Sequence, residues 1–174
     1  MPVSPAPLPP PRQPDGPYRV CCVCLGNICR SPIAEVVLRD QVARAGLAGA
    51  VLVDSAGTGD WHIGAPMHAG SRKQLARNGY DGESHRARQF DPSWLRERDL
   101  VLAMDAANLR DLRAMAPTAD HDRIRLFGEV ACLDGQDVPD PYYGTDADFA
   151  GVLALLETGM SRLTARLSDQ FQNP

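Results

Sequence analysis

Cys24 and Arg30 are the two residues whose types and spacing point most directly to chemistry. Gly26 and Asn27 lie between them and tolerate left-handed backbone, so the loop can curl until its main-chain N–H groups converge on an anion. A guanidinium matches two oxygens of a phosphate, and a thiolate is a nucleophile. We therefore interpret the loop as a phosphate-binding site with Cys24 at its floor. The candidate phosphate-binding residues are Leu25, Gly26, Asn27, Ile28, Cys29, Arg30 and Ser31.

The flanking pattern favours this interpretation over a chance pairing. A cysteine followed by an arginine is common, and most buried cysteines are small apolar filler. Here an apolar stretch typical of a strand, Tyr18–Val23, leads into the loop, and Ser31-Pro32 begins a helical pattern. The dipole of that helix favours negative charge at the loop. Ser31 can cap the helix, donate a hydrogen bond to the Cys24 thiolate, or do both.

Four apolar stretches alternate with helical patterns and predict an α/β fold. Helical spacing follows the loop, covers residues 69–77 and recurs near the C-terminus; Leu95 marks a short helical turn, and Asp105 can cap the helix after the third strand. This alternation predicts a doubly wound parallel sheet with helices on both faces, which binds ligands beyond the carboxyl ends of its strands. The predicted strands are Tyr18–Val23, Ala50–Asp54, Asp99–Met104 and Arg123–Leu126.

Residues 1–17 differ in composition from the rest of the chain. They hold eight of the 15 prolines and almost no large apolar side chains. Such a segment cannot bury anything, so we expect a disordered, partly extended, proline-rich tail. The remaining residues, 18–174, are enough for one domain with a proper core.

Composition excludes several classes of function. The net charge of −4 argues against nucleic acid or an anionic membrane as the main partner. The five cysteines show no metal-ligand spacing, and we expect no metal and no other cofactor. No apolar run approaches membrane-spanning length, and the N-terminus lacks the apolar core of a signal peptide. We therefore expect a cytoplasmic location. The oligomeric state stays open, with a monomer as the default.

Four motifs resemble, in the same order, the signatures of the low-molecular-weight protein tyrosine phosphatase family. They are Val23-Cys-Leu-Gly-Asn-Ile-Cys-Arg-Ser-Pro32, Asp54-Ser-Ala-Gly-Thr-Gly-Asp-Trp61, Ser84-His-Arg-Ala-Arg-Gln89 and Val138-Pro-Asp-Pro-Tyr-Tyr143. The resemblance covers roughly Tyr18 to the C-terminus. It implies a three-layer fold with a four-stranded parallel sheet in the order 2-1-3-4. It also implies phosphotyrosine-containing proteins as substrates and inhibition by phosphate-like oxyanions.

The resemblance implies a mechanism with a phosphocysteine intermediate. Cys24 attacks phosphorus, and the loop N–H groups with Arg30 hold the phosphate oxygens as charge spreads. The leaving group needs a proton, for which Asp140 is the best candidate because prolines on both sides restrict its loop. Deprotonated Asp140 could then activate water. Without the resemblance, Asp140 reads as an ordinary turn residue.

Supporting residues follow from the same resemblance. Asn27 is expected to adopt left-handed backbone, which needs anchoring of its side chain. The implied partners are Ser55, just after the second strand, and His85. Without the resemblance, His85 would be interpreted as a solvated loop histidine.

Three aromatic residues lie on predicted loops and outside the apolar stripes: Trp61, Tyr142 and Tyr143. Aromatic residues on loops suit the walls of a cleft that holds a flat group, and by resemblance they flank the phosphotyrosine ring. Partial burial against the domain is the alternative, especially for Tyr143. His62 is a further candidate for the rim.

Cys29 lies in the same loop as Cys24. A second thiol can trap an oxidised cysteine as a disulfide, and the resemblance implies such reversible inactivation. The other cysteines, Cys21, Cys22 and Cys132, are expected to be strand or core filler.

Three alternative functions remain open. A phosphoarginine phosphatase has a similar loop, but those relatives carry Thr where Ile28 stands. An arsenate reductase of related fold needs further cysteines to pass a disulfide outward, and Cys132 stands alone. A binding module without activity would have no need of the acid at Asp140.

Overall fold

The computed structural model describes residues 4–172 of the 174-residue chain. Its centre is a four-stranded parallel sheet with the order β2-β1-β3-β4, which confirms the predicted fold class and strand order. β1 lies between β2 and β3, with Val20 opposite Val53 on one side and Leu100 on the other. The strands are β1 Tyr18–Cys24, β2 Val51–Gly57, β3 Leu100–Ala103 and β4 Ile124–Leu126.

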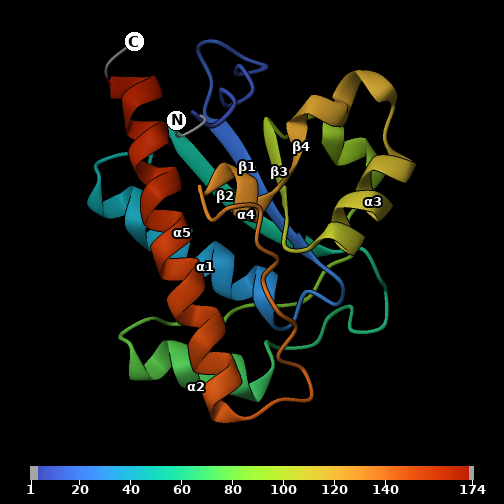
Figure 1. Cartoon of the computed structure of the whole chain (residues 1–174), viewed down its shortest axis with the longest axis vertical. Helices are drawn as coiled ribbons and strands as arrows, with labels where there is room; N and C mark the ends of the chain where they lie inside the picture. Colours follow the sequence, from blue (N-terminus) through green and yellow to red (C-terminus); the bar gives the residue numbers. More distant parts are fainter. Residues whose placement is uncertain (1–3, 173–174) are drawn as a thin grey trace.

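Helices cover both faces of the sheet (Figure 1). The helices α1 Arg30–Arg44, α2 Ala69–Arg77 and α5 Asp146–Gln172 pack together on one face. The other face holds α3 Ala106–Met115 and the short 3₁₀ helix η1 Pro92–Arg96. Side chains of β1 alternate between the two cores, because successive residues of a strand point to opposite faces: Val20 and Cys22 contribute to the larger core, Cys21 and Val23 to the smaller.

Short elements account for most differences from the predicted secondary structure. The predicted turn at Leu95 is η1, but η2 Thr118–Arg123 and α4 Phe127–Val130 were not predicted, because single turns have no periodicity to detect. β2 continues to Gly57, so Ser55 lies inside this strand and not after it. Among the described residues, no helix combines the length and apolar character needed to cross a membrane.

The N-terminal segment 4–17 forms no helix or strand, yet it packs against the domain. Pro9 is buried, and its carbonyl accepts a hydrogen bond from the Tyr18 hydroxyl at 2.9 Å. Leu8 packs against the larger core. Extended proline-rich backbone leaves its carbonyls free. Arginines of the domain bind the carbonyls of Ala6, Pro7 and Pro10. The prediction that this tail buries nothing is therefore wrong for residues 4–17, whereas residues 1–3 lie outside the described part.

Arg12 connects this segment to the domain most extensively. Its side chain donates to Asp120 at 2.7 Å and to the carbonyl of Arg98 at 2.9 Å, and its main-chain N–H donates to Asp99 at 2.6 Å. The Arg12–Asp120 pair is only about one-quarter exposed. The segment is therefore joined to the residues around β3.

We expect Arg12→Ala to lower the free energy of unfolding, measured by urea denaturation, by about 1–3 kcal/mol, because it removes charge-assisted hydrogen bonds in a partly buried site. Gln13→Ala is the control, since Gln13 is exposed and its side chain makes no hydrogen bond to another described residue. Equal urea midpoints for wild type and both variants would show that the contacts of Arg12 add nothing to stability.

Candidate active site

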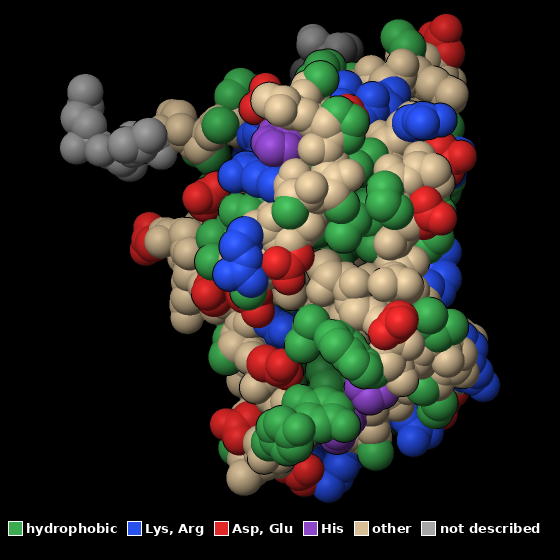
Figure 2. All heavy atoms as spheres, turned by 90° about the vertical axis from the view of Figure 1, so that its right-hand side faces the viewer, with side chains coloured by type: hydrophobic (Ala, Val, Ile, Leu, Met, Phe, Trp, Pro, Cys, Tyr) green, Lys and Arg blue, Asp and Glu red, His purple; other side chains and the backbone are tan. Residues whose placement is uncertain are grey.

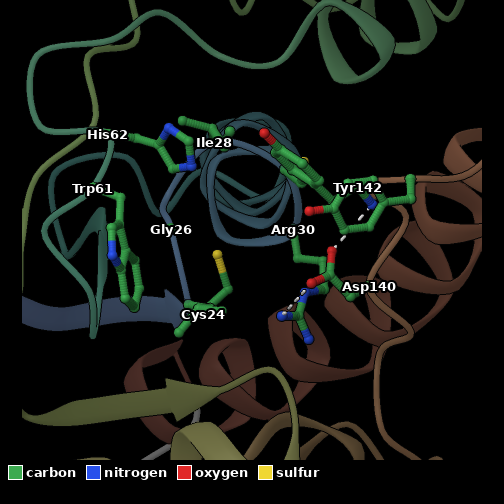
Figure 3. A pocket seen from close by; sticks show the side chains of 11 residues that line it. Cys24, Gly26, Ile28, Arg30, Trp61, His62, Asp140 and Tyr142 are labelled. Carbon is green, nitrogen blue, oxygen red and sulfur yellow. Dashed lines mark hydrogen bonds and ion pairs between the residues drawn. The ribbon is translucent and has the colours of Figure 1, made fainter.

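A cavity of about 220 Å³ opens at the carboxyl end of β1, and Cys24 lies at its floor. Cys24 is the last residue of β1 and is 2% exposed. The structure thus brings together most of the predicted site residues (Figure 3). The lining residues are Cys24, Leu25, Gly26, Ile28, Cys29, Arg30, Trp61, His62, Asp140, Tyr142 and Tyr143. The predicted supporting residues do not line the cavity: Asn27 and Ser31 lie within the loop, and Ser55 and His85 contact Asn27.

Several main-chain carbonyls of the loop accept hydrogen bonds from residues outside the loop. Main-chain N–H groups of Thr58, Gly59 and His68 donate to the carbonyls of Cys24, Leu25 and Ile28 at 2.8–2.9 Å. Within the described part of the chain, no main-chain N–H from Leu25 to Cys29 donates to another protein group. Peptide carbonyls that point outward leave the opposite N–H groups pointing inward. The loop therefore presents N–H groups without a protein acceptor in the described chain, with the N-terminus of α1 at its end, a combination that suits an anion.

Asn27 has left-handed backbone, with φ of 57°, and is fully buried. Its side-chain N–H₂ donates to Ser31 at 2.8 Å and to Ser55 at 2.9 Å. Its side-chain oxygen accepts from the main-chain N–H of Arg88 at 2.9 Å, and its carbonyl lies 2.8 Å from Nε2 of His85. Every polar group of this side chain thus has a partner, and the partners fix the turn of the loop.

Ser31 is the second residue of α1, so the expectation that it caps this helix is wrong. Cys29 occupies the N-cap position without a side-chain hydrogen bond. The Ser31 hydroxyl lies 3.0 Å from the Cys24 sulfur and 3.2 Å from the carbonyl of Ala56, while it accepts from Asn27. A hydroxyl has one proton, so donation to a Cys24 thiolate competes with donation to Ala56.

Gly57 was missed as a site residue. A Cβ at this position would lie 2.6 Å from the carbonyl oxygen of Leu25 and 3.0 Å from the nitrogen of Asn27. The loop can rest on the end of β2 only because Gly57 has no side chain. The available signal was a glycine three residues beyond the predicted second strand, Ala50–Asp54, within the second of the four motifs.

Arg30 also lines the cavity, and hydrogen bonds fix the position of its side chain. Its guanidinium, 3% exposed, donates to Asp105 at 2.6 Å and to the carbonyl of Val138 at 3.1 Å. Its Nε is buried without a hydrogen-bond partner among the described residues. Burial alone lowers the pKa of Arg30, but the nearby Cys24, Asp105 and Asp140 outweigh it and raise this pKa, so the side chain stays charged.

Asp105 has a second role that sequence reasoning missed. One oxygen accepts from the main-chain N–H of Asn108 at 2.7 Å and caps α3, as predicted, while the other binds Arg30. Asp105 directly follows the third predicted strand, so its place at the carboxyl edge of the sheet was a usable signal. Because one carboxylate holds both α3 and Arg30, the guanidinium keeps a fixed orientation.

Asp140 reaches the cavity from the loop that precedes α5. Its carboxylate is 47% exposed, lies 3.6 Å from Arg30 and accepts the main-chain N–H of Tyr142 at 3.1 Å. Figure 3 shows Asp140 beside Tyr142, on the opposite side of Cys24 from Trp61. The acid is therefore solvent-accessible but directed by its own loop.

Aromatic residues form the rim. Trp61 is 69% exposed and Tyr143 is 97% exposed, so the alternative of partial burial for Tyr143 is wrong. Tyr142 is more enclosed and packs against the rings of His68 and Tyr143 at centroid distances of 5.5 and 4.7 Å. Figure 2 shows hydrophobic side chains around a hollow low on the face that it views, beside histidines. The cavity thus has an apolar mouth and a polar floor.

The remaining cysteines fall into two groups. Cys29 is buried beside the cavity, and burial raises the pKa of its thiol to about 12. Cys21 and Cys22 are buried in β1, as predicted, whereas Cys132 is exposed and the prediction that it fills the core is wrong. Among residues 4–172 there is no group of three His, Cys, Asp or Glu that could hold a metal ion.

Comparison with known proteins gives one consistent family. Residues 19–173 match the family model for low molecular weight phosphotyrosine protein phosphatase. A relative from Streptomyces coelicolor, named low molecular weight protein-tyrosine-phosphatase, is 47% identical over 89% of this chain and 96% of its own length. The crystal structure of YfkJ from Bacillus subtilis is 38% identical with a TM-score of 0.82, over 92% of this chain and 100% of its own. A protein tyrosine phosphatase from Entamoeba histolytica, with Hepes in its active site, gives a TM-score of 0.83 and 32% identity over 88% of this chain and 98% of its own.

The position of His85 predicts a pH dependence of stability. Burial lowers the pKa of His85 below its ordinary value of 6.5. At pH values between the lowered pKa of the folded state and 6.5, the unfolded chain binds more protons than the folded one. The free energy of unfolding therefore falls as pH drops below about 6.5. We expect His85→Gln, which can still donate to Asn27 but cannot titrate, to lose less stability than wild type between pH 7.5 and 5.5. Urea denaturation at both pH values measures this difference, and equal losses in the two proteins would contradict the role of His85.

Proposed function

The chain belongs to the low molecular weight phosphotyrosine protein phosphatase family, and on this basis we propose that it hydrolyses phosphotyrosine in proteins through a covalent intermediate on Cys24. The observation that carries the proposal is the loop around Cys24, in which the carbonyls of Cys24, Leu25, Asn27 and Ile28 bind groups outside the loop. The N–H groups of Leu25 to Cys29 and the Nε of Arg30 have no hydrogen-bond acceptor among residues 4–172, and the loop that carries them leads from Cys24 to the N-terminus of α1. These donors suit the three equatorial oxygens of a phosphoryl group.

In the proposed first step, the Cys24 sulfur attacks phosphorus in line with the leaving oxygen. The bond to the tyrosine oxygen breaks as the S–P bond forms, and nucleophilic catalysis thereby divides one difficult displacement into two. The Ser31 hydroxyl, 3.0 Å from the sulfur, can stabilise the thiolate before attack and again as it leaves. The fixed Arg30 supports the charge that spreads over the phosphate.

Asp140 is the proposed general acid and then the general base. It donates a proton to the departing phenolate and later removes one from the water that hydrolyses the phosphocysteine. Its exposure and its place at the cavity mouth suit contact with a leaving group and with water. The Asp140 carboxylate lies 3.6 Å from the Arg30 guanidinium, so both groups would lie next to the reacting phosphate.

The rim supports an aromatic substrate. A phenyl ring between Trp61 and Tyr142 would bring its phosphate to Cys24, and flat rings gain contact area there. We propose that Trp61, His62, Tyr142 and Tyr143 line the substrate cleft. Phosphoserine offers no ring for these residues to contact. Phosphoarginine offers a flat guanidinium, and the loop residue Ile28 is the feature that favours phosphotyrosine over it.

We retain three further expectations as proposals. Residues 18–174 are the catalytic unit, in agreement with the span of the family match. The protein acts as a monomer in a reducing compartment such as the cytoplasm, because oxidation of Cys24 would abolish the nucleophile. Cys29 can trap an oxidised Cys24 as a disulfide. The Cys29 thiol must lose its proton before it attacks, and its raised pKa of about 12 disfavours that loss.

We expect Cys24→Ser to abolish hydrolysis of phosphotyrosine peptides, with a fall of about 10³-fold or more because the nucleophile is lost. Binding of phosphate or vanadate should largely survive, since the loop donors remain. Peptides with phosphotyrosine, phosphoserine and phosphoarginine should be compared in the same assay, and Cys132→Ser serves as the control because Cys132 is exposed and does not line the cavity. Full activity of Cys24→Ser would exclude the mechanism, and a preference for phosphoarginine would replace the proposed substrate.

We expect Asp140→Ala to lower kcat for phenyl phosphate by about 10²-fold or more, since its phenolate leaving group needs a proton. The loss should be much smaller for an aryl phosphate with a highly acidic phenol. Asp60→Ala, an exposed acid beside Trp61, should leave the ratio of the two rates unchanged. Equal losses of Asp140→Ala on both substrates would remove the role of general acid from this residue.

A further inference from the structure

Behind the phosphate-binding loop, two arginines converge on one carboxylate. Asp54 in β2 accepts hydrogen bonds from Arg88 at 2.9 Å and from Arg98 at 2.5 Å. Both guanidinium groups lie over the ring of Trp94, at 4.6 Å and 5.0 Å from its centroid. We call these four residues the Asp54 cluster. None of them lines the cavity of Figure 3.

The Asp54 cluster joins two of the three groups that bind the Asn27 side chain. One partner is the Ser55 hydroxyl, in the residue after Asp54, and the other is the main-chain N–H of Arg88. The Arg88 guanidinium donates to Asp54 and also to the carbonyl of Ser55 at 3.0 Å. Residues 27, 55 and 88 thus form a closed ring of contacts, of which the Arg88 side chain is one side.

Contact with the Trp94 ring explains why the Arg88 side chain stays in place although it is 44% exposed. A guanidinium that lies over an indole ring and binds a carboxylate is restricted in its rotation. Arg98, buried and bound to the same Asp54 oxygen, restricts that carboxylate in turn. The cluster therefore acts as one rigid group and not as an isolated surface ion pair, which would contribute little.

We propose that Asp54, Arg88, Trp94 and Arg98 are positioning residues that keep the phosphate-binding loop in its anion-binding conformation by acting through Asn27. The inference rests on the proposed function, because it assigns the cluster to the same site. Asn27 has left-handed backbone, and its turn sets the direction of the neighbouring N–H groups. Displacement of the Arg88 N–H or of Ser55 changes that direction without touching a residue of the cavity.

The test compares Arg88→Met with Arg86→Met. Met retains an unbranched stem over Trp94 but removes the bonds to Asp54 and Ser55. Arg86 lies two residues away in the same segment and is exposed. Among the described residues its side chain donates only to the nearby carbonyls of Glu83 and His85, so it is a matched control. The measurements are kcat for an aryl phosphate, the inhibition constant for vanadate, the thermal melting curve and the amide ¹H–¹⁵N spectrum.

We expect Arg88→Met to lower kcat and vanadate affinity by about tenfold each, since small displacements of reacting groups reduce rates by this order or more. The amide signals of residues 25–30 should shift, and Arg88→Lys should recover part of the loss because it can reach Asp54 with one donor. Arg86→Met should match wild type within about twofold in all four measurements, as expected for an exposed site. Trp94→Leu, which leaves the hydrogen bonds of the cluster in place, should shift the same amide signals and provides the test if Arg88→Met does not fold.

Two results would overturn the inference. A folded Arg88→Met with wild-type vanadate affinity and unshifted loop amides would assign the cluster to stability alone. Equal shifts in Arg88→Met and Arg86→Met would remove its specificity. If wild type itself had no phosphatase activity, the proposed function would fail, but the loop amide signals would still report whether Arg88 positions Asn27.

Discussion

The left-handed backbone of Asn27 is the constraint on which the site depends. A non-glycine residue at positive φ costs about 1–2 kcal/mol, and burial of its amide without partners would add to that cost. The hydrogen bonds to Ser31, Ser55, Arg88 and His85 offset both. Glycine could adopt the same φ without strain, but it would have no side chain to join α1, β2 and the segment after α2. Asparagine thus couples the shape of the loop to three parts of the fold.

The parallel sheet explains how residues far apart in sequence reach one cavity. β1, β2 and β3 lie side by side, so their carboxyl ends meet at the same edge. Cys24 ends β1, Gly57 ends β2, and Asp105 follows β3 closely. Because β1 is central, with chain crossovers to both sides, its loop has neighbours on both sides that can support it. Asp140 comes from a loop outside the sheet, so its carboxylate is accessible to solvent, whereas Cys24 and Arg30 are buried.

Local patterns in the sequence predicted the parts of this architecture that depend on neighbouring residues. Strand and helix periodicity predicted β1 and α1, and the resemblance of four motifs predicted which residues surround Cys24. The contact of Asp105 with Arg30 depends on which strands are adjacent, and sequence periodicity does not encode that. The same limit applies to the N-terminal segment: its free carbonyls are a local property, but the arginines that bind them are more than 100 residues away. Gly57 was visible as a glycine, but only the fold reveals what a Cβ would meet.

The basic residues of this chain also connect separate parts of the fold. Lys73 is the only lysine among its 18 Lys and Arg residues. Arg30, Arg88 and Arg98 each bind at least two separate groups, and a planar guanidinium can do this because its donors diverge in fixed directions. An ammonium could replace the charge at these positions but not the geometry. The arginines that connect separate segments are therefore part of what makes the loop around Cys24 rigid.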